Sequence, residues 1–176
     1  MIQIRALTEA LSPRLAEDLS ALLIDAVEGG ASLGFLKPLD LERAQVYWES
    51  VARAVKAGDK ALLVAEIEGA IVGTVQVVLD MPQNQPHRGE ISKMIVHTKV
   101  RQLGLGMRLL EAAEERARFA GKSLMVLDTQ TGSAAEHLYK KAGYSPLPPL
   151  PDYALTPDGE LAPTTIFWKR IQSRHL

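Results

Sequence analysis

Two glycines follow an arginine near the middle of the chain, where a helix is expected to begin. Arg101, Gly104 and Gly106 lie in the stretch VRQLGLGMRLL, and Lys99 and Arg108 add positive charge nearby. The first turn of a helix leaves backbone N–H groups without partners, and glycine removes the side chains that would keep an anion away from them. The pattern predicts a binding site for a diphosphate.

The residues after the glycines argue against two common phosphate-binding loops. A nucleoside-triphosphate loop carries lysine and then serine or threonine after its last glycine, whereas Gly106 is followed by Met107 and Arg108. A dinucleotide-binding loop has a small residue three positions after the second glycine, and here that residue is Leu109. The diphosphate therefore belongs to another class of compound.

Hydrophobic periodicity predicts the elements that position this loop. Helices are expected after Ser12, from Asp40, from Gly104 to Gly121, and from Ser133 to Gly143, with Ser133 and Glu136 spaced as a capping box. Strands are expected at 2–7, 61–69, 70–81, 90–97, 123–129 and 164–171, with 146–163 as a long connection. This order predicts a single α/β domain over 1–176 with a mixed sheet.

Residues 90–129 form a strand, a helix and a strand, so the two strands should be parallel. The glycine loop then lies at the carboxyl end of a parallel strand, where open α/β sheets bind ligands.

Composition excludes several function classes. Lysine plus arginine (20) nearly balance aspartate plus glutamate (21), so no overall charge favours nucleic acid or an anionic membrane. Cysteine is absent, and the four histidines, His87, His97, His137 and His175, lack the spacing of metal ligands, so no metal is expected. The sequence shows neither a signal segment near Met1 nor an apolar run of roughly 18 residues, which predicts a cytoplasmic protein.

The spacing of Arg101, Gly104 and Gly106 matches the pyrophosphate loop of the GNAT superfamily of coenzyme A dependent N-acetyltransferases. The order of elements resembles the GNAT fold, a central mixed sheet flanked by helices. The stretches GGASLGF, LDTQTGSAAEHLY and PDYALTPDGELAPTTIFWK further resemble the tabtoxin resistance acetyltransferases of this superfamily. The resemblance implies an acetyl-CoA dependent N-acetyltransferase.

This resemblance implies where the coenzyme binds. It places the diphosphate on Arg101, Gln102, Leu103, Gly104, Leu105, Gly106 and Met107. The backbone of Met94, Ile95 and Val96 is expected to pair with the pantetheine arm as an added strand does. Ser133 occupies a position where many relatives have an asparagine that contacts the coenzyme, although a role as helix cap explains it equally well.

The resemblance also implies three catalytic side chains. Glu90 and Asp128 match the carboxylates assigned to the acceptor side and to proton removal through water, and Tyr139 matches the general acid near the coenzyme sulfur. A base is needed because an alkyl ammonium has a pKa of roughly 10. The alternatives are a solvated strand start for Glu90, a cap for Asp128 and core packing for Tyr139.

The acceptor is expected to be a small-molecule amine that is selected by loops around the coenzyme site. Three segments are candidates: 29–39 with Ser32 and Phe35, then 82–89, and 146–163 with Asp152 and Tyr153. Two carboxylates near the acceptor suit a cationic amine, an amino acid, a toxin or an antibiotic. The alternative functions are a nonenzymatic acyl-CoA sensor and a peptide or protein N-acetyltransferase. Such folds commonly form homodimers, so a homodimer is possible here as well.

Overall fold

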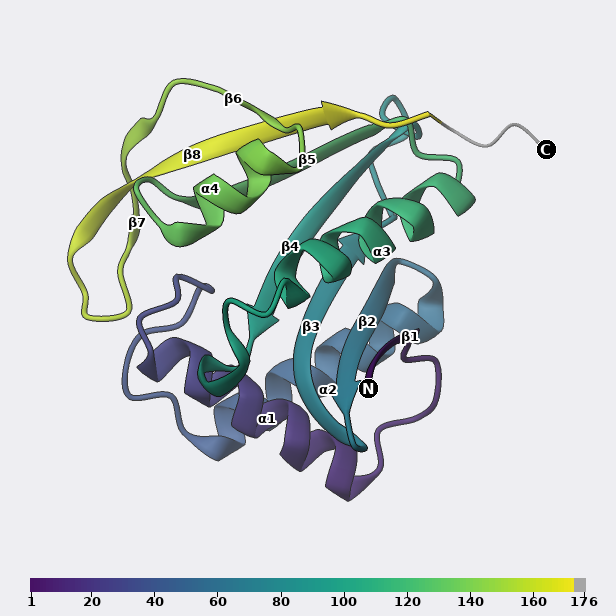
Figure 1. The fold of residues 1–176 in the computed structure, drawn as a ribbon, viewed down its shortest axis with the longest axis vertical. Coiled ribbons are helices and arrows are strands. Elements are labelled where there is room, and N and C mark those ends of the chain that lie inside the picture. Colours follow the sequence, from purple (N-terminus) through teal and green to yellow (C-terminus); the bar gives the residue numbers. More distant parts are fainter. Residues whose placement is uncertain (173–176) are drawn as a thin grey trace.

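A single mixed sheet organises the protein, and helices cover both of its faces (Figure 1). The structure is a computed structural model that describes residues 1–172, so His175 lies outside the described residues. The strands are β1 (Ile2–Ala6), β2 (Lys60–Ile67), β3 (Ala70–Val78), β4 (Arg88–Val96), β5 (Leu124–Gln130), β6 (Ser145–Pro146), β7 (Leu150–Leu155) and β8 (Leu161–Arg170). The helices are α1 (Pro13–Glu28), α2 (Leu41–Ala57), the short 3₁₀ helix η1 (Thr98–Val100), α3 (Leu105–Phe119) and α4 (Ala134–Lys141).

The sheet has the order β1-β2-β3-β4-β5-β8-β6, and β7 also pairs with β8. The pair β4–β5 is parallel, as the strand–helix–strand unit predicts, and the other described pairs are antiparallel. The α/β class with a mixed, helix-flanked sheet is therefore confirmed. The connection between β4 and β5 contains α3, so the glycine loop lies at the carboxyl end of β4.

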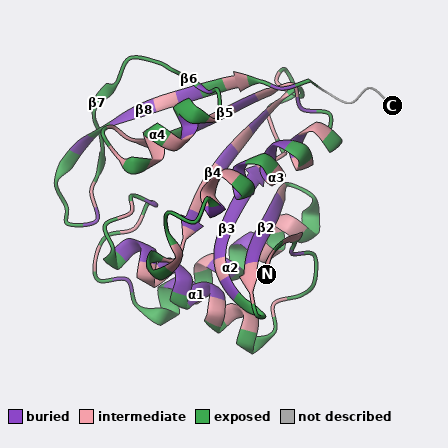
Figure 2. Cartoon of the chain, in the orientation of Figure 1, coloured by how far each residue is buried: buried purple, intermediate pink, exposed green. Residues whose placement is uncertain are grey.

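Helices α1 and α2 begin at the predicted caps and cover one face of the sheet. Ser12 Oγ accepts a hydrogen bond from Leu15 N at 3.2 Å, and Asp40 Oδ1 accepts one from Arg43 N at 2.8 Å. Each cap satisfies a backbone donor that the first turn leaves free. Trp48 of α2 is fully buried in a cluster contributed by both helices and the inner strands. Figure 2 shows that β2 and β3 are largely buried.

The other face of the sheet packs against α3 and α4. Leu109, Leu110 and Ala113 of α3 are fully buried against Met125 of β5 and Phe167 of β8. The apolar stripe of α3 recurs at helical spacing, which explains why this helix could be recognised in the sequence. β4 thus contributes to the cores on both faces of the sheet, and β5 to the core under α3 and α4.

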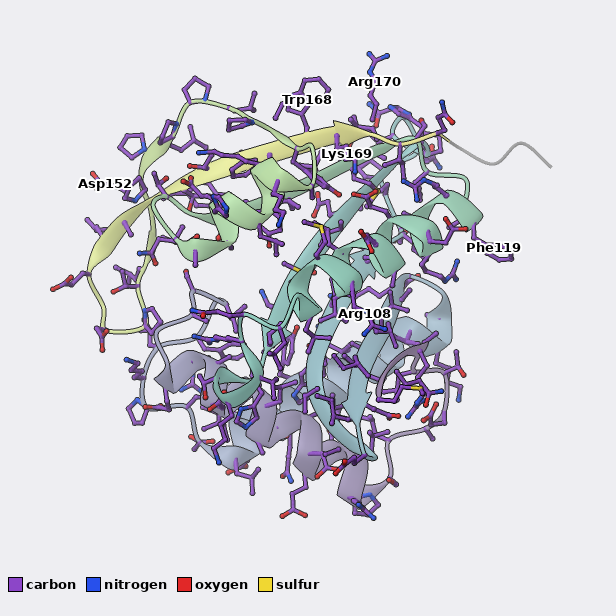
Figure 3. The ribbon with its side chains drawn as sticks, in the orientation of Figure 1. Arg108, Phe119, Asp152, Trp168, Lys169 and Arg170 are labelled. Atoms are coloured by element: carbon purple, nitrogen blue, oxygen red, sulfur yellow. The ribbon has the colours of Figure 1, made fainter. Side chains whose placement is uncertain are left out.

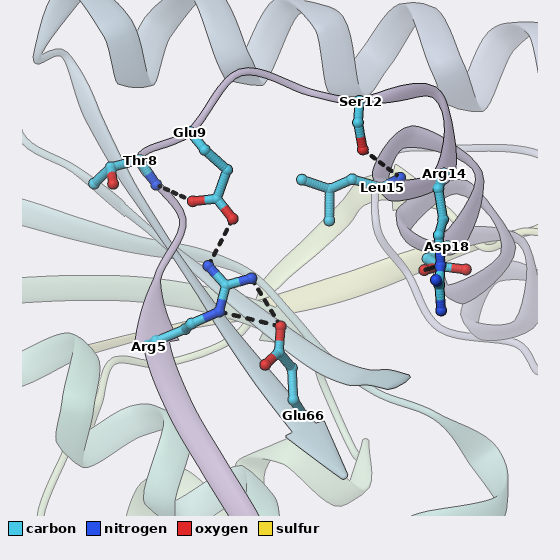
Figure 4. A network of polar contacts seen from close by, with 8 residues as sticks. All are labelled: Arg5, Thr8, Glu9, Ser12, Arg14, Leu15, Asp18 and Glu66. Atoms are coloured by element: carbon cyan, nitrogen blue, oxygen red, sulfur yellow. Dashed lines mark hydrogen bonds and ion pairs between the residues drawn. The ribbon is translucent and has the colours of Figure 1, made fainter. Parts of the chain in front are cut away.

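Polar contacts attach the first strand to the sheet (Figure 4). Arg5 donates to Glu66 Oε1 of β2 from Nη2 at 2.8 Å and from Nε at 3.1 Å, and its Nη1 reaches Glu9 Oε1 at 2.8 Å. These bonds fix the segment that leads into α1, because Glu9 lies just before the Ser12 cap.

The prediction of an unstructured connection over 146–163 is wrong. This segment contains the last residue of β6 and all of β7, and β8 begins at Leu161, three residues earlier than expected. All residues of β7 are exposed, so the strand lacks the apolar alternation that identifies a strand in sequence. Its proline is tolerated because edge strands need not donate every backbone N–H.

Candidate functional site

The two parallel strands part soon after they meet. They pair at Arg88↔Leu124, Gly89↔Met125 and Glu90↔Val126, after which β5 continues only against β8 and β4 only against β3. Figure 1 shows the two strands diverging from this point. We call this arrangement the β4–β5 fork. Residues 91–96 of β4 have no strand partner on the β5 side, so their backbone is open to an extended ligand.

The glycine loop lies at the open end of this fork and carries unpaired backbone N–H donors. Within residues 1–172, the N–H groups of residues 102–107 have no hydrogen-bond partner. Gly104 is the N-cap of α3, with φ of 75°, and no side chain caps the helix. Several free N–H groups at a helix start attract an anion through their dipoles. The loop therefore fits a diphosphate.

The two glycines have different roles. A Cβ on Gly104 would meet nothing within 4 Å, so this glycine is required by its left-handed backbone and leaves the loop open. A Cβ on Gly106 would lie 3.1 Å from Leu138 Cδ2 of α4. The expectation that Gly106 only clears space for the anion is therefore incomplete, because it also lets α3 and α4 approach closely.

The positive charges around the loop are distributed unequally. Arg101 is exposed, and its Nε donates to the carbonyl of Val96 at 3.3 Å, across the end of the fork. Lys99 is exposed beside it. Arg108 instead donates from Nη2 to the carbonyl of Ile2 at 3.2 Å and points toward β1 (Figure 3). The predicted contribution of Arg108 to the diphosphate site is thus wrong.

A contact with α1 fixes the segment between β4 and the loop. Asp25 accepts hydrogen bonds from Thr98 N at 2.9 Å and from Thr98 Oγ1 at 2.8 Å. Burial raises the pKa of Asp25, but the two bonds from Thr98 bring that pKa below its usual value. An ionised Asp25 therefore holds η1, and with it the start of the loop, against α1.

The carboxylates of Glu90 and Asp128 lie on neighbouring strands in different surroundings. Glu90 forms an ion pair with Arg88, whose Nε also donates to Gln85 Oε1 at 2.6 Å. The carboxylate of Asp128 has no hydrogen bond or ion pair within residues 1–172. Burial raises the pKa of Asp128, Lys93 lowers it and Glu90 raises it. The two carboxylates are thus close enough to interact.

Tyr139 of α4 lies deep in the core on the other side of β5. It is 6% exposed, and its ring lies 5.7 Å from that of Phe167 and 6.2 Å from that of Tyr144, measured between centroids. Burial raises the pKa of Tyr139, and the negative charge of Asp128 raises it further. The phenol therefore stays protonated at neutral pH and can only donate its proton.

Ser133 begins α4 but does not form the predicted capping box. Its Oγ lies 3.0 Å from Thr129 Oγ1 of β5, and no side-chain hydrogen bond caps the helix. The hydroxyl is used to join the helix start to the end of β5, so the expectation of a capping side chain is wrong.

Lys93 is a charged residue of the site that the sequence analysis missed. It lies on β4 three residues after Glu90, half-buried, with φ of 50°. Burial lowers the pKa of Lys93, Asp128 raises it and Lys60 lowers it. One signal was present in the sequence, because the consecutive polar residues Ser92 and Lys93 interrupt the alternation of EISKMIV.

Two of the expected acceptor loops meet in the structure. The backbone N–H of Lys37 donates to the carbonyl of Pro157 at 2.9 Å, and Lys37 Nζ lies 3.3 Å from Asp158 Oδ1. These contacts join the α1–α2 loop to the β7–β8 turn. In the α1–α2 loop, Ser32 is exposed and the ring of Phe35 packs edge-on against Tyr47 at 5.3 Å.

The remaining acceptor candidates lie on β7 and in the segment that leads into β4. Asp152 and Tyr153 are exposed on β7, and neither is bonded to Glu90 or Asp128 within the described chain (Figure 3). The segment 82–87 lies at the amino end of β4, where Lys122 Nζ donates to the carbonyls of Leu79 and Pro86. Arg88 of the segment 82–89 forms the ion pair with Glu90, so the end of this segment lies beside one of the two carboxylates.

Among residues 1–172, no three histidine, cysteine, aspartate or glutamate side chains gather as metal ligands would. No helix in the same part of the chain has the length and apolar character needed to cross a bilayer.

Comparison with known proteins gives one family and many similar folds. Residues 26–144 match the family described as Acetyltransferase (GNAT) family. An N-acetyltransferase from the hisH–hisA intergenic region of Azospirillum brasilense is 31% identical over 115 residues, which cover 64% of this chain and 67% of that protein. An L-methionine sulfoximine/L-methionine sulfone acetyltransferase of Pseudomonas aeruginosa is 29% identical over 126 residues, 70% of this chain and 71% of that protein.

The similarity of the fold extends over the whole chain. A Salmonella typhimurium protein solved with its cofactor acetyl-CoA superposes with a TM-score of 0.78 at 19% identity, covering 99% of this chain and 96% of that one. At this identity the likeness concerns the fold alone.

Proposed function

Because the chain belongs to the GNAT family of acetyltransferases, whose co-substrate is acetyl-CoA, we propose that it transfers the acetyl group to the amine of a small molecule. The observation that carries this proposal is the β4–β5 fork, with the unpaired N–H groups of residues 102–107 at its mouth. The free edge of β4 and the donor loop match the two polar parts of coenzyme A, its pantetheine amides and its diphosphate.

The residues that would hold the coenzyme follow from that match. The N–H groups of Gln102, Leu103, Gly104, Leu105, Gly106 and Met107 would bind the diphosphate, with Arg101 supplying the cation. The open backbone of Met94, Ile95 and Val96 would accept the pantetheine as an added strand. Ser133, where β5 meets α4, would border the same site. When bound, acetyl-CoA supplies the carbonyl carbon that an amine attacks and the sulfur that leaves.

Asp128 is the better candidate for the base. The pKa of Asp128 is raised by burial, and its carboxylate has no ion-pair partner within residues 1–172, whereas the Glu90 carboxylate is engaged by Arg88. Asp128 would take a proton from the ammonium group, directly or through water, so that the amine nitrogen can form its new bond to carbon. Glu90 would border the acceptor side, held in place by Arg88.

Tyr139 suits the role of proton donor. Its pKa is raised by burial and by Asp128, so the hydroxyl is protonated whenever the site is in use. It would donate to the sulfur as the carbon–sulfur bond breaks, and solvent would restore its proton. A thiol has a pKa of about 8.5, so this donor assists the reaction and is not indispensable to it.

An amino acid or a toxin or antibiotic derived from one is the acceptor class we favour. The Pseudomonas aeruginosa relative named for L-methionine sulfoximine and L-methionine sulfone supports it, as does the resemblance to the tabtoxin resistance acetyltransferases. Ser32 and Phe35 in the α1–α2 loop would line the acceptor side, because this loop contacts the β7–β8 turn. Asp152 and Tyr153 on β7 would contribute from the hairpin.

The test combines calorimetry and turnover. Calorimetry with coenzyme A and acetyl-CoA should show binding, and thiol release should follow with amino acids, polyamines or aminoglycosides. Arg101→Ala should weaken coenzyme binding by about tenfold, while the matched control Arg53→Ala, on the exposed face of α2, should leave it unchanged. Absence of coenzyme binding refutes the proposal. Binding without thiol release on any amine indicates a sensor, and activity on peptides alone indicates a peptide acetyltransferase.

A further inference from the structure

A β-bulge turns Lys93 out of the regular alternation of β4. Thr74 of β3 pairs with Ile95, and Gln76 pairs with Ser92, so β4 has an extra residue at this point. Lys93 has a left-handed backbone with φ of 50°. Bulges of this kind redirect a side chain and are frequent beside active sites. The ammonium of Lys93 consequently lies near the α1–α2 loop, 3.7 Å from the position that a Cβ on Gly34 would occupy.

The ammonium has no partner in this position. Within residues 1–172, Lys93 makes no hydrogen bond or ion pair, although it is half-buried and an ammonium has three donors to satisfy. Lys60, whose positive charge lowers the pKa of Lys93, donates to Gln76 Oε1 at 3.4 Å. A half-buried charge without a partner is costly, which makes Lys93 a candidate for binding an anion.

Asp128 provides the opposite charge across the fork. Asp128 and Lys93 each shift the pKa of the other, yet they do not form an ion pair, and Asp128 has no other hydrogen bond among the described residues. Glu90 does not compete for Lys93, because Arg88 engages it. The site therefore presents one free cation and one free anion, close together but not joined. A molecule with both charges would satisfy both groups.

We propose that Lys93 binds the carboxylate of a zwitterionic acceptor, an α-amino acid, while Asp128 faces its ammonium group. This inference rests on the proposed function, and it assigns to Lys93 the selection of acceptors that carry an anion beside the amine. It also orients the acceptor, since the two fixed charges place its nitrogen next to the base. Lys93 has no role toward the coenzyme in this scheme.

The test compares matched acceptors with and without the anion. L-methionine, L-methionine sulfone and the other common L-amino acids are assayed beside their carboxamides, with wild type, Lys93→Gln and Lys93→Arg. Lys93→Gln should raise KM for the acids by about tenfold or more, because a charge-assisted bond is lost, and should also lower their kcat, because the nitrogen is no longer held next to the base. Each carboxamide should give the same KM with wild type and with Lys93→Gln. Lys93→Arg should retain most of the selectivity, and the exposed-lysine control Lys56→Gln should behave as wild type.

Other results overturn the inference. Equal loss on acids and carboxamides would mean that Lys93 acts on the coenzyme or on the fold, and wild type that shows no preference for acids would exclude the carboxylate contact. Acetyl-CoA binding without turnover of any amino acid would overturn the inference while leaving coenzyme binding intact. Failure of acetyl-CoA to bind at all would instead refute the proposed function. Calorimetry with acetyl-CoA separates these cases for every variant.

Discussion

Replacing Lys169 tests whether a buried ion pair holds α3, α4 and β8 together. Glu114 of α3 is 5% exposed and accepts from Lys169 Nζ at 2.7 and 3.0 Å and from Arg118 Nη2 at 2.9 Å. Lys169 Nζ also donates to the carbonyl of Ala142 at the end of α4, at 2.9 Å, and points inward while its neighbours on β8 point outward (Figure 3). Lys169→Met would leave Glu114 buried with only Arg118 as a partner.

The expected loss is large because an incompletely compensated charge remains buried. Breaking such a pair costs about 3 kcal/mol, taken at the low end because Arg118 remains. For a chain of this size, that loss lowers Tm by about 6 to 12 °C. Urea unfolding and calorimetry measure both quantities. Lys140→Met is the control, because the exposed Lys140 only approaches Glu136 to 3.9 Å, and less than about 0.5 kcal/mol is expected for such a contact.

A double variant separates the charge from the packing. The double variant Lys169→Met/Glu114→Gln should lose less folding stability than the single variant Glu114→Gln. The reason is that the single variant leaves Lys169 without its carboxylate partner, whereas the double variant does not. If Lys169→Met destabilises the protein no more than Lys140→Met does, the reasoning from burial is wrong.

Three further predictions concern the proposed site. Asp128→Asn should lower kcat by about 10²- to 10⁴-fold. Because the Asp128 side chain is partly exposed to solvent, the same variant should leave Tm at pH 7 nearly unchanged, and a large loss of Tm would mean that the fall in kcat reflects damage to the fold. Tyr139→Phe should lower kcat by about tenfold, because the leaving sulfur loses its proton donor. The loss should be larger above pH 8, where solvent supplies fewer protons in place of the Tyr139 hydroxyl. Full activity of the variant would mean that Tyr139 serves only in packing. Gly104→Ala should cost about 1 kcal/mol of folding stability and weaken coenzyme binding, whereas Gly121→Ala, with the similar φ of 78° and equal free space, should cost the same stability without affecting binding.

The features that could be predicted from the sequence depend on residues close together in the chain. The caps at Ser12 and Asp40 act on N–H groups three residues later, and the unit β4, α3, β5 follows from periodicity and short connections. The glycine loop also belongs to this class, because its geometry is set by its own backbone.

The features that were missed depend on partners far away in the chain. The guanidinium of Arg108 binds a carbonyl 106 residues away, and the space beside Gly106 is set by Leu138 of another helix. The position of Lys93 depends on the register of β4 against β3, which no local pattern of apolar residues specifies. The strand β7 forms on the edge of β8 with all its residues exposed, so its formation depends on backbone pairing alone.

Three residue pairs are all that join β4 to β5, and this short seam has a mechanical consequence. The core beneath α3 crosses this seam, because it contains Ile91 of β4 together with Met125 of β5, so packing rather than strand pairing joins the two halves of the sheet beyond Glu90. A ligand lying along residues 91–96 would lengthen the seam and stiffen the molecule. Amide hydrogen exchange along β4 should therefore slow when acetyl-CoA is present.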